Sequence, residues 1–300
     1  MLVLNLNDQL GNQLFSYASI KSVCLKRGIK FGWYISKSLL INSTDEKYGN
    51  TFEQLFEIDL SERINEEQTS SWNNWREPWP RADTNFLPHI YSIPENTVVY
   101  GHFQTPKYFD EYKKDVIKWY TFKTSIKVIA EQRFLDIRRN YDKKTIFVGI
   151  HIRIGNDYLR ENRNLAHSYY RNAVRWMNEY FIGSEVVFIL FSDCIRKAQK
   201  ILKGSKVEIA KGSLFADLCL MTLCDANIVS NSTFSWWGAW LNKNCAVTLR
   251  PSVYPISNND YYPLDIFPSD WKSIPASRGR KYPVYHYYHL RTKIKKCLKA

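Results

Sequence analysis

With 300 residues, of which 45% are hydrophobic and 24% charged, the chain has the composition of a globular protein with one large or two ordinary domains. Its formal net charge of +13 favours an anionic partner, such as a nucleotide, a nucleic acid or a membrane surface. The sequence lacks a long apolar run for a membrane-spanning helix, a CxxC pair for zinc, and the GxGxxG or Walker motifs of dehydrogenases and kinases. Because it starts directly on a strand-like run without signal-peptide features, we expect a cytoplasmic protein.

The first part of the chain alternates strand-like and helix-like runs. We predict strands at 2–6, 30–35 and 97–101, a loop over 7–11, a helix over 12–27 that stops at Gly28, and a helical stretch from 106 to about 120. The region from 61 to 95 is rich in proline and tryptophan, and its prolines forbid long helices. Its tryptophans either form a platform that stacks on sugar rings or anchor buried loops.

A second α/β pattern begins near Lys144. Its predicted strands are 145–154, 186–192, 206–210, 226–230 and 245–249, and its predicted helices are 164–181, 194–203, 213–223 and 234–242. Two successive patterns predict an α/β fold with two Rossmann-like domains that face a cleft. The boundary is expected within 125–144, which divides the chain into domains at 1–135 and 136–300.

The strand predicted at 145–154 carries polar residues that do not fit a plain core. Its apolar residues alternate and share one face, namely Val148, Ile150, Ile152 and Ile154. His151 and Arg153 share the other face, and Asp157 follows shortly after. An arginine presents a planar fork of donors that fits phosphate oxygens, so this strand end suggests an anion-binding site. The alternative is an edge strand on which Arg153 forms a salt bridge with Asp157.

A second candidate follows the strand predicted at 226–230, where polar residues precede a helix. These residues are Asn231, Ser232 and Thr233, followed by Phe234. Open α/β sheets bind ligands outside the carboxyl ends of their strands, and hydroxyls together with helix N-terminal amides suit a pyrophosphate. The alternative is a capping run whose tryptophans belong to the core, and both interpretations can hold together.

Two further segments have two interpretations each. Asp193 follows a buried strand, where its carboxylate can accept hydrogen bonds from a purine or a ribose hydroxyl, or can cap the next helix. Gly11 and Asn12 stand at a helix start, where amide groups and the helix dipole favour an anion. A simple cap by Asn12 accounts for the same residues.

Five motifs, in this order, resemble the fucosyltransferase superfamily and fit glycosyltransferase family 11, the α-1,2-fucosyltransferases of the soluble bacterial type. The motifs are Gly11-Asn12-Gln13-Leu14-Phe15-Ser16-Tyr17-Ala18, Gly101-His102-Phe103-Gln104-Thr105-Pro106-Lys107-Tyr108-Phe109, His151-Ile152-Arg153, Phe191-Ser192-Asp193 and Asn231-Ser232-Thr233-Phe234-Ser235-Trp236-Trp237. The resemblance implies a GT-B-like fold, GDP-fucose as donor, inversion at the anomeric carbon and no metal. The family usually reads His-x-Arg-Arg-Gly-Asp. Here Ile154 and Asn156 make the motif more like that of protein O-fucosyltransferases, which leaves the acceptor open.

The resemblance also implies roles for individual residues. Arg153 would grip the donor β-phosphate, and His151 and Asp193 would hold the guanosine half. Asn12 would lie where donor and acceptor meet, and Gly11 beside it would bind the donor. The donor-binding turn that would line the pyrophosphate consists of Asn231, Ser232, Thr233 and Phe234.

We expect direct displacement, in which an acceptor hydroxyl attacks the fucosyl carbon while GDP leaves. Arg153 and the amides of 232–235 would stabilise the charge that grows on the β-phosphate. Asp157, Glu161 and His167 lie within range as general base, and Asp157 is the one we select. The alternative is that the leaving phosphate itself assists. The expected acceptor is a galactoside-type glycan, free or lipid-linked, with an α-1,2 linkage.

Three alternatives remain open: a protein O-fucosyltransferase, a transferase of another GDP-deoxyhexose, and a basic nucleic-acid-binding protein. The last is disfavoured because no nucleic-acid-binding motif occurs, and we expect no nucleic acid as partner. The C-terminal tail suits either solvent or an anionic surface at the inner face of the membrane. Its basic residues are Arg278, Arg280, Lys281, Arg291, Lys293, Lys295, Lys296 and Lys299.

Overall fold

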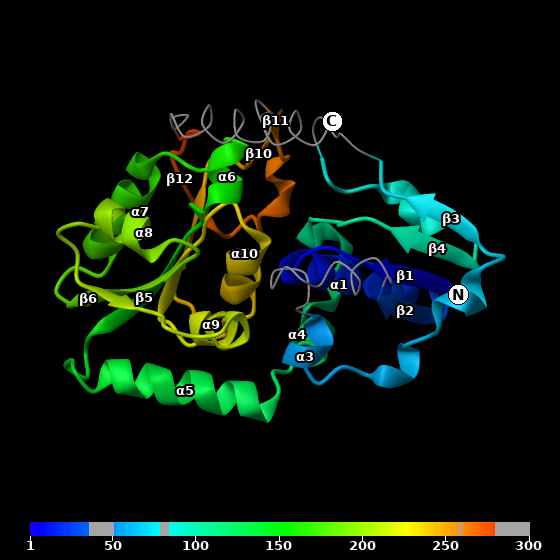
Figure 1. The fold of residues 1–300 in the computed structure, drawn as a ribbon, viewed down its shortest axis with the longest axis horizontal. Coiled ribbons are helices and arrows are strands. Elements are labelled where there is room, and N and C mark those ends of the chain that lie inside the picture. The colour runs from blue at the N-terminus through cyan, green and yellow to red at the C-terminus, as the bar shows by residue number, and fades with distance from the viewer. Residues whose placement is uncertain (36–50, 79–83, 258–259, 280–300) are drawn as a thin grey trace, which may run out of the picture. The chain divides into compact units, whose positions relative to one another are not determined.

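The computed structural model describes residues 1–35, 51–78, 84–257 and 260–279 of the chain. The chain folds as two units, of which the first comprises Met1–Gln132 with Pro263–Ser269 and the second Arg133–Tyr262 with the residues from Asp270 onward. Each unit contains its own parallel sheet (Figure 1), which confirms the predicted α/β class. Within the described ranges, no helix is long and apolar enough to cross a membrane.

The sheet of the first unit has four parallel strands in the order β2-β1-β4-β3. They are β1 (Leu2–Leu6), β2 (Phe31–Ile35), β3 (Asn73–Arg76) and β4 (Thr97–Tyr100). Helix α1 (Leu10–Arg27) covers one face, because Tyr17 on α1 packs edge-on against Phe31 and Trp33 of β2. The helix ends at Gly28 as predicted, in a left-handed conformation (φ 63°) that glycine adopts without steric penalty.

Short helices occupy the rest of the first unit. They are α3 (Phe52–Leu55), α4 (Lys113–Trp119) and the 3-10 helices Leu60–Glu62, Glu66–Thr69, Pro88–Ser92, Pro106–Tyr108, Asp110–Tyr112 and Leu264–Ile266. The stretch from 106 to 120, predicted as one helical run, is divided because Phe109 leaves the helical region at φ −135° and ψ 0°. The longer helix α5 (Thr124–Arg138) spans the position where the first unit passes into the second.

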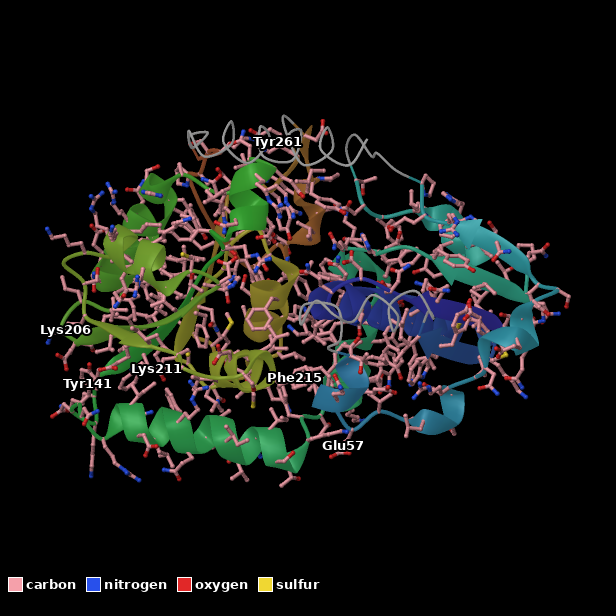
Figure 2. The ribbon with its side chains drawn as sticks, viewed as in Figure 1. Glu57, Tyr141, Lys206, Lys211, Phe215 and Tyr261 are labelled. Atoms are coloured by element: carbon pink, nitrogen blue, oxygen red, sulfur yellow. The ribbon has the colours of Figure 1, made fainter. Side chains whose placement is uncertain are left out.

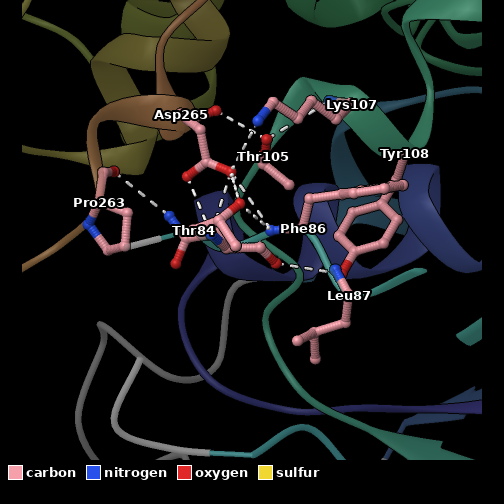
Figure 3. A network of polar contacts seen from close by, with 9 residues as sticks. Thr84, Phe86, Leu87, Thr105, Lys107, Tyr108, Pro263 and Asp265 are labelled. Carbon is pink, nitrogen blue, oxygen red and sulfur yellow. Dashed lines mark hydrogen bonds and ion pairs between the residues drawn. The ribbon is translucent and has the colours of Figure 1, made fainter. Parts of the chain in front are cut away.

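The segment Pro263–Ser269 belongs to the first unit although it lies late in the chain. Figure 3 shows the cause, since the Asp265 carboxylate accepts a hydrogen bond from the Thr84 hydroxyl at 2.6 Å and others from the next two backbone amides. The backbone oxygen of Asp265 accepts from the Thr105 hydroxyl at 2.6 Å. The charge-assisted bonds anchor the segment to the chain before β4, and the bond from Thr105 anchors it to the chain after β4.

The sheet of the second unit has six parallel strands in the order β12-β9-β8-β5-β6-β7. They are β5 (Ile146–Ile152), β6 (Val186–Ser192), β7 (Val207–Ile209), β8 (Ala226–Ile228), β9 (Thr248–Pro251) and β12 (Lys272–Ile274). A separate antiparallel pair consists of β10 (Pro255–Ser257) and β11 (Asp260–Tyr261). The helices are α6 (Asn156–Arg160), α7 (His167–Tyr180), α8 (Ile195–Ile201), α9 (Leu214–Met221) and α10 (Thr233–Trp240).

The predicted alternation along β5 is confirmed. Val148, Ile150 and Ile152 are fully buried in one cluster with residues of α7 and α8, which therefore cover that face of the sheet. On the opposite face, Phe147 packs edge-on against Phe134 of α5, with ring centroids 5.6 Å apart. Both faces of β5 are thus covered, as in other parallel sheets.

Helix α5 has no counterpart among the predicted elements. Its apolar residues Val128, Ile129 and Leu135 are at least 50% exposed, so no buried stripe marks the helix in the sequence. Tyr141, labelled in Figure 2, lies in the chain after α5. It ties this chain to the sheet, because its hydroxyl donates to the Glu208 carboxylate of β7 at 2.7 Å.

Candidate active site

The second sheet reverses its strand order between β5 and β8. From β5 the chain continues outward through β6 and β7, whereas β8, β9 and β12 extend the sheet in the opposite direction. All six strands are parallel, so their carboxyl ends share one edge, and ligands of such sheets bind at the switch point. The structure brings predicted residues to this edge: His151 and Arg153 at the end of β5, Asp193 after β6, and the turn 231–234 after β8.

Arg153 is held by two carboxylates. Its Nη2 lies 2.7 Å from Asp157 Oδ2, and its Nη1 lies 2.9 Å from Asp193 Oδ2. The three side chains are 15–18% exposed, so water screens these pairs only partly. The guanidinium also lies over the Tyr158 ring, 4.8 Å from its centroid. These contacts fix the planar N–H groups of the guanidinium in one orientation. The salt bridge between Arg153 and Asp157 is the alternative that the sequence left open.

Asp193 is fixed by the backbone that follows β5. Its carboxylate accepts hydrogen bonds from the backbone amides of Ile154 and Gly155, both at 2.9 Å. A Cβ at position 155 would overlap this carboxylate, so the close approach requires glycine. The N-cap of α8 is Cys194 rather than Asp193. Asp193 therefore orients Arg153 here, and its predicted contact with a purine or ribose stays a prediction.

His151 links the two strands at the switch point. The residue is 5% exposed, and its Nδ1 lies 2.9 Å from the hydroxyl oxygen of Ser230, which follows β8. Burial, reinforced by the charge of Arg153, lowers the pKa of His151 to about 3, so the imidazole is neutral at neutral pH. Its ring also contacts Phe234 of α10, with centroids 5.5 Å apart. Sequence reasoning did not identify Ser230 as the partner of His151, although its place at a strand end is the same signal that found its neighbours.

The turn between β8 and α10 has the predicted form. Ser232 is the N-cap of α10 and makes no side-chain capping bond, and Thr233 and Phe234 begin the helix. Amide groups in a first helical turn have no partner within the helix and can bind an anion. Asn231 is fully buried, and its Nδ2 donates to two backbone oxygens at 2.8 and 2.9 Å, so it holds the turn in place.

The tryptophans of α10 belong to the core, as the alternative interpretation predicted. Trp236, Trp237 and Trp240 pack against one another, with ring centroids 4.8 to 5.8 Å apart. All three tryptophans lie after the first residues of α10, so the N-terminal turn of the helix stays polar. A core role for the tryptophans is therefore compatible with an anion bound at that turn.

The two departures from the usual family motif have different surroundings, since Ile154 is buried and Asn156 is exposed. Ile154 is 1% exposed and belongs to the hydrophobic cluster of the second unit, and Asn156 is the first residue of α6. Neither position contributes to the fork of Arg153. The two differences therefore leave the arrangement around that guanidinium intact.

The three residues considered as general base have different surroundings. Asp157 is paired with Arg153, and Glu161 lies with Oε2 2.9 Å from Arg163 Nε. His167 begins α7 and is half-buried, and burial followed by the nearby charge of Arg171 lowers its pKa. Among the residues that the structure describes, no three His, Cys, Asp or Glu side chains are grouped to hold a metal ion.

A second polar cluster surrounds Asn12 in the first unit. Helix α1 begins at Leu10, so Gly11 and Asn12 lie in its first turn rather than at its cap or in the predicted loop. Asn12 Nδ2 donates to Asp8 Oδ2 at 2.7 Å, and its Oδ1 accepts from Gln104 Nε2 at 2.6 Å. The cap of α1 is Gln9, not Asn12, so the Asn12 side chain serves this cluster rather than the helix end.

The same cluster contains a histidine–carboxylate contact that the sequence did not indicate. Nε2 of His102 lies 2.9 Å from Asp8 Oδ2, and the two side chains are 35% and 32% exposed. His102 stood within a quoted motif without a role, and Asp8 was placed in a loop. Asp8 follows β1 and His102 follows β4, and a polar residue after a buried strand is the signal that could have identified them.

Comparison with known proteins agrees with this architecture. Residues 1–275 match the model of a family described as Glycosyl transferase family 11. The chain is 29% identical to an alpha-1,2-colitosyltransferase of Escherichia coli over 187 residues, which cover 58% of this chain and 61% of that enzyme. It is 22% identical to galactoside alpha-(1,2)-fucosyltransferase 2 of Oryctolagus cuniculus, over 93% of this chain and 78% of that protein. The fold is similar to that of fucosyltransferase NodZ from Bradyrhizobium, with a TM-score of 0.51, 15% identity, and coverage of 79% and 92% of the two chains.

Proposed function

The chain belongs to glycosyl transferase family 11, and on this basis we propose that it transfers L-fucose from GDP-fucose to a hydroxyl of a galactoside-type glycan. The expected product is an α-1,2 linkage formed with inversion at the anomeric carbon. That the chain is a glycosyltransferase follows from the family. The donor sugar, the acceptor and the linkage are the proposal.

One observation carries the proposal: the fork of Arg153 and the first turn of α10 both stand at the carboxyl edge of the second sheet, at its switch point. A diphosphate is recognised by N–H groups that point at its oxygens, and a guanidinium and a helix N-terminus supply them from two sides. The His151–Ser230 contact joins the two strands that carry these groups. The predicted contacts of His151 and Asp193 with the guanosine half are part of the proposal.

In the proposed reaction, the acceptor oxygen bonds to the fucosyl carbon while the bond from that carbon to the β-phosphate oxygen breaks. The electron pair of the broken bond leaves with GDP, and negative charge grows on the β-phosphate. Arg153 and the amides of 232–235 stabilise that charge in place, with no reorganisation during the reaction. Asn12 belongs to the acceptor side, where its amide can hold a sugar hydroxyl.

We also propose that the reaction needs no metal ion. The sequence has no Asp-x-Asp triplet, which is the usual carboxylate pair that bridges a metal to a sugar nucleotide. Arg153 and the helix amides are donors of the type that replaces a metal at a leaving phosphate. The charge on the leaving group is therefore met by groups that belong to the chain itself.

The test begins with GDP, which should raise the melting temperature of the protein. Arg153→Lys keeps the charge but loses the fork, and we expect it to lower transfer about 10²–10³-fold, or about 3–4 kcal/mol, and to reduce the GDP effect. Arg133→Lys is the matched control, since Arg133 Nη1 lies 3.1 Å from Asp217 Oδ1 at similar exposure and outside the site. Near-normal transfer by Arg153→Lys would refute the assignment.

The similarity to an alpha-1,2-colitosyltransferase favours a second candidate donor, GDP-colitose or another GDP-deoxyhexose. Equal amounts of GDP-fucose and GDP-colitose, offered with one galactoside acceptor, would separate the two. Predominant fucosylation, with the linkage read by NMR, supports the first proposal, and predominant colitosylation replaces it. Transfer to a folded protein but not to glycans would instead favour the protein O-fucosyltransferase alternative.

We propose further that the protein meets a lipid-linked acceptor at an anionic membrane surface through its basic tail. Residues 280–300 of that tail lie outside the described residues. Arg278 is described, and its Nη2 donates to the backbone oxygen of Asp260 at 2.9 Å. Deletion of the chain after Gly279 should abolish co-sedimentation with anionic liposomes, and unchanged binding would remove the idea.

A further inference from the structure

The first sheet has a switch point of its own, and the Asp8–His102 pair bridges it. From β1 the chain crosses to β2 on one side, whereas β4 and β3 extend the sheet on the other side. Asp8 follows β1 and His102 follows the adjacent β4. The pair therefore occupies the position where open parallel sheets bind ligands, and about a third of each side chain is exposed.

Neighbouring amides orient this pair. Besides His102, Asp8 Oδ2 accepts from Asn12 Nδ2, and Asp8 Oδ1 accepts from the next backbone amide at 2.7 Å. Gln104 is 4% exposed, and its Nε2 donates to Asn12. Its Oε1 is buried without a hydrogen-bond partner in the described structure. A buried amide oxygen without a partner is unfavourable, so the cluster has one acceptor that a further donor, such as the hydroxyl of a ligand, would satisfy.

The charges of the cluster suit a hydroxyl-bearing ligand rather than a phosphate. Two carboxylates face His102, namely Asp8 and Glu77, and Glu77 accepts hydrogen bonds from the backbone amides of His102 and Phe103. Burial raises the pKa of Asp8, but the contact with His102 and the other donors outweigh burial and lower it below its ordinary value. Asp8 is therefore an anion at neutral pH, and it repels a diphosphate while it attracts the hydroxyl groups of a sugar.

The segment that carries His102 is held firmly. Phe103 is fully buried, and the Thr105 hydroxyl donates to the backbone oxygen of Asp265 (Figure 3). Lys107 Nζ lies 3.5 Å from the carboxylate of Asp265. An imidazole on a rigid segment, with a carboxylate fixed beside it, is the arrangement that general base catalysis requires.

We propose that the Asp8–His102 pair is the general base that takes the proton of the acceptor hydroxyl. This inference rests on the proposed fucosyl transfer. The O–H bond of the acceptor breaks, its electron pair forms the bond to the fucosyl carbon, and the proton moves to the imidazole of His102. The electron pair of the sugar–phosphate bond leaves with GDP. His102 is the catalytic residue, and Asp8 is the positioning residue that compensates the imidazolium charge.

This assignment replaces Asp157 as the base. Asp157 is engaged by Arg153, so its role is to orient the guanidinium. The proposal also gives a reason for an aspartate at a position with φ 67°, which is uncommon for a residue other than glycine. The aspartate side chain at this position makes the contact to His102.

The test measures transfer as a function of pH in three variants and a control. His102→Gln can still donate to Asp8 but cannot take a proton, and we expect it to lower transfer at least about 10²-fold. Asp8→Asn removes the charge, and Asp8→Gly does so at a backbone position that glycine accepts without strain. Glu62→Gln is the matched control, because it breaks the partly buried pair with Lys21 in the same unit.

Without the carboxylate, the imidazole holds its proton less tightly, so both Asp8 variants should shift the acid limb of the pH profile to lower pH and lower the turnover number. The control should leave the acid limb in place. A pH profile that is identical in wild type, Asp8→Gly and His102→Gln overturns the proposal, and so does a loss confined to the KM for acceptor. GDP affinity, measured by calorimetry, should stay the same in all four proteins. If wild-type protein neither binds GDP nor transfers sugar, the proposed function itself has failed.

Discussion

Replacing His151 by asparagine is expected to change how the stability of the protein depends on pH. The imidazole is buried beside Ser230, and burial together with the charge of Arg153 lowers its pKa to about 3. In the unfolded chain the pKa returns to about 6.5. Between these values the unfolded chain binds a proton that the folded chain does not, so a falling pH favours unfolding. The stability that the neutral imidazole contributes is therefore complete above about pH 6.5 and is lost progressively towards pH 3.

The size of this pH effect on stability follows from the one proton that the unfolded chain binds at His151 and the folded chain does not. One pKa unit corresponds to about 1.4 kcal/mol, so below its ordinary pKa this group alone lowers the free energy of unfolding by about 1.4 kcal/mol per pH unit. Between about pH 7.5 and about pH 5 the loss amounts to about 2 kcal/mol. Asparagine can bond to Ser230 but does not titrate. The stability difference between wild type and His151→Asn should therefore shrink by about 2 kcal/mol over this range.

Urea unfolding followed by tryptophan fluorescence measures the free energy of unfolding at both pH values. The contributions of the other titrating groups to the free energy of unfolding cancel in the comparison, because wild type and variant share these groups. Ser230→Ala is the matched control, since it removes the partner of the imidazole but keeps the imidazole, and its offset from wild type should stay nearly constant. Stability curves that run parallel for wild type and His151→Asn would refute the argument from burial.

Tyr158→Phe removes a hydroxyl that donates to the backbone oxygen of Asn231 at 2.9 Å, and urea titration should show a loss of about 1 kcal/mol in the free energy of unfolding. Gly155→Ala should displace the Asp193 carboxylate and weaken GDP binding about ten-fold by calorimetry, and unchanged affinity would contradict this account. Exhaustive treatment with EDTA should leave transfer unchanged, whereas activity lost to EDTA and restored by Mg²⁺ would contradict the metal-independent mechanism.

The elements that could be predicted are those with a clear apolar pattern. β1 is buried along its whole length, and every second residue of β5 from Val148 to Ile152 is an apolar residue of the core. Both strands can therefore be recognised in the sequence. β3 lacks such a pattern, since three of its four residues are exposed at the edge of the sheet. The return of Pro263–Ser269 to the first unit depends on Asp265 and distant donors, which no local pattern encodes.

The donor-side residues could be predicted because each follows a buried strand. Arg153 and Asp193 were found in this way, but their mutual contact depends on the path of the loop through Gly155, which the sequence does not show. The same rule applies to Asp8 and His102. Their pairing requires that β1 and β4 be neighbours, and that order is set by tertiary packing rather than by the spacing of residues.

The charges around Arg153 indicate that the donor is recognised by the orientation of N–H groups rather than by the net charge of the site. Arg153 with Asp157 and Asp193 carries one net negative charge, and His151 adds none because burial keeps it neutral. A diphosphate is therefore not drawn by this group as a whole. It can bind only through N–H groups that point at it. A guanidinium has about five N–H groups, so the contacts with two carboxylates leave others for the diphosphate. A lysine ammonium would be taken up between the two carboxylates and would present no fork. This is the physical reason why Arg153→Lys should fail although the charge is conserved.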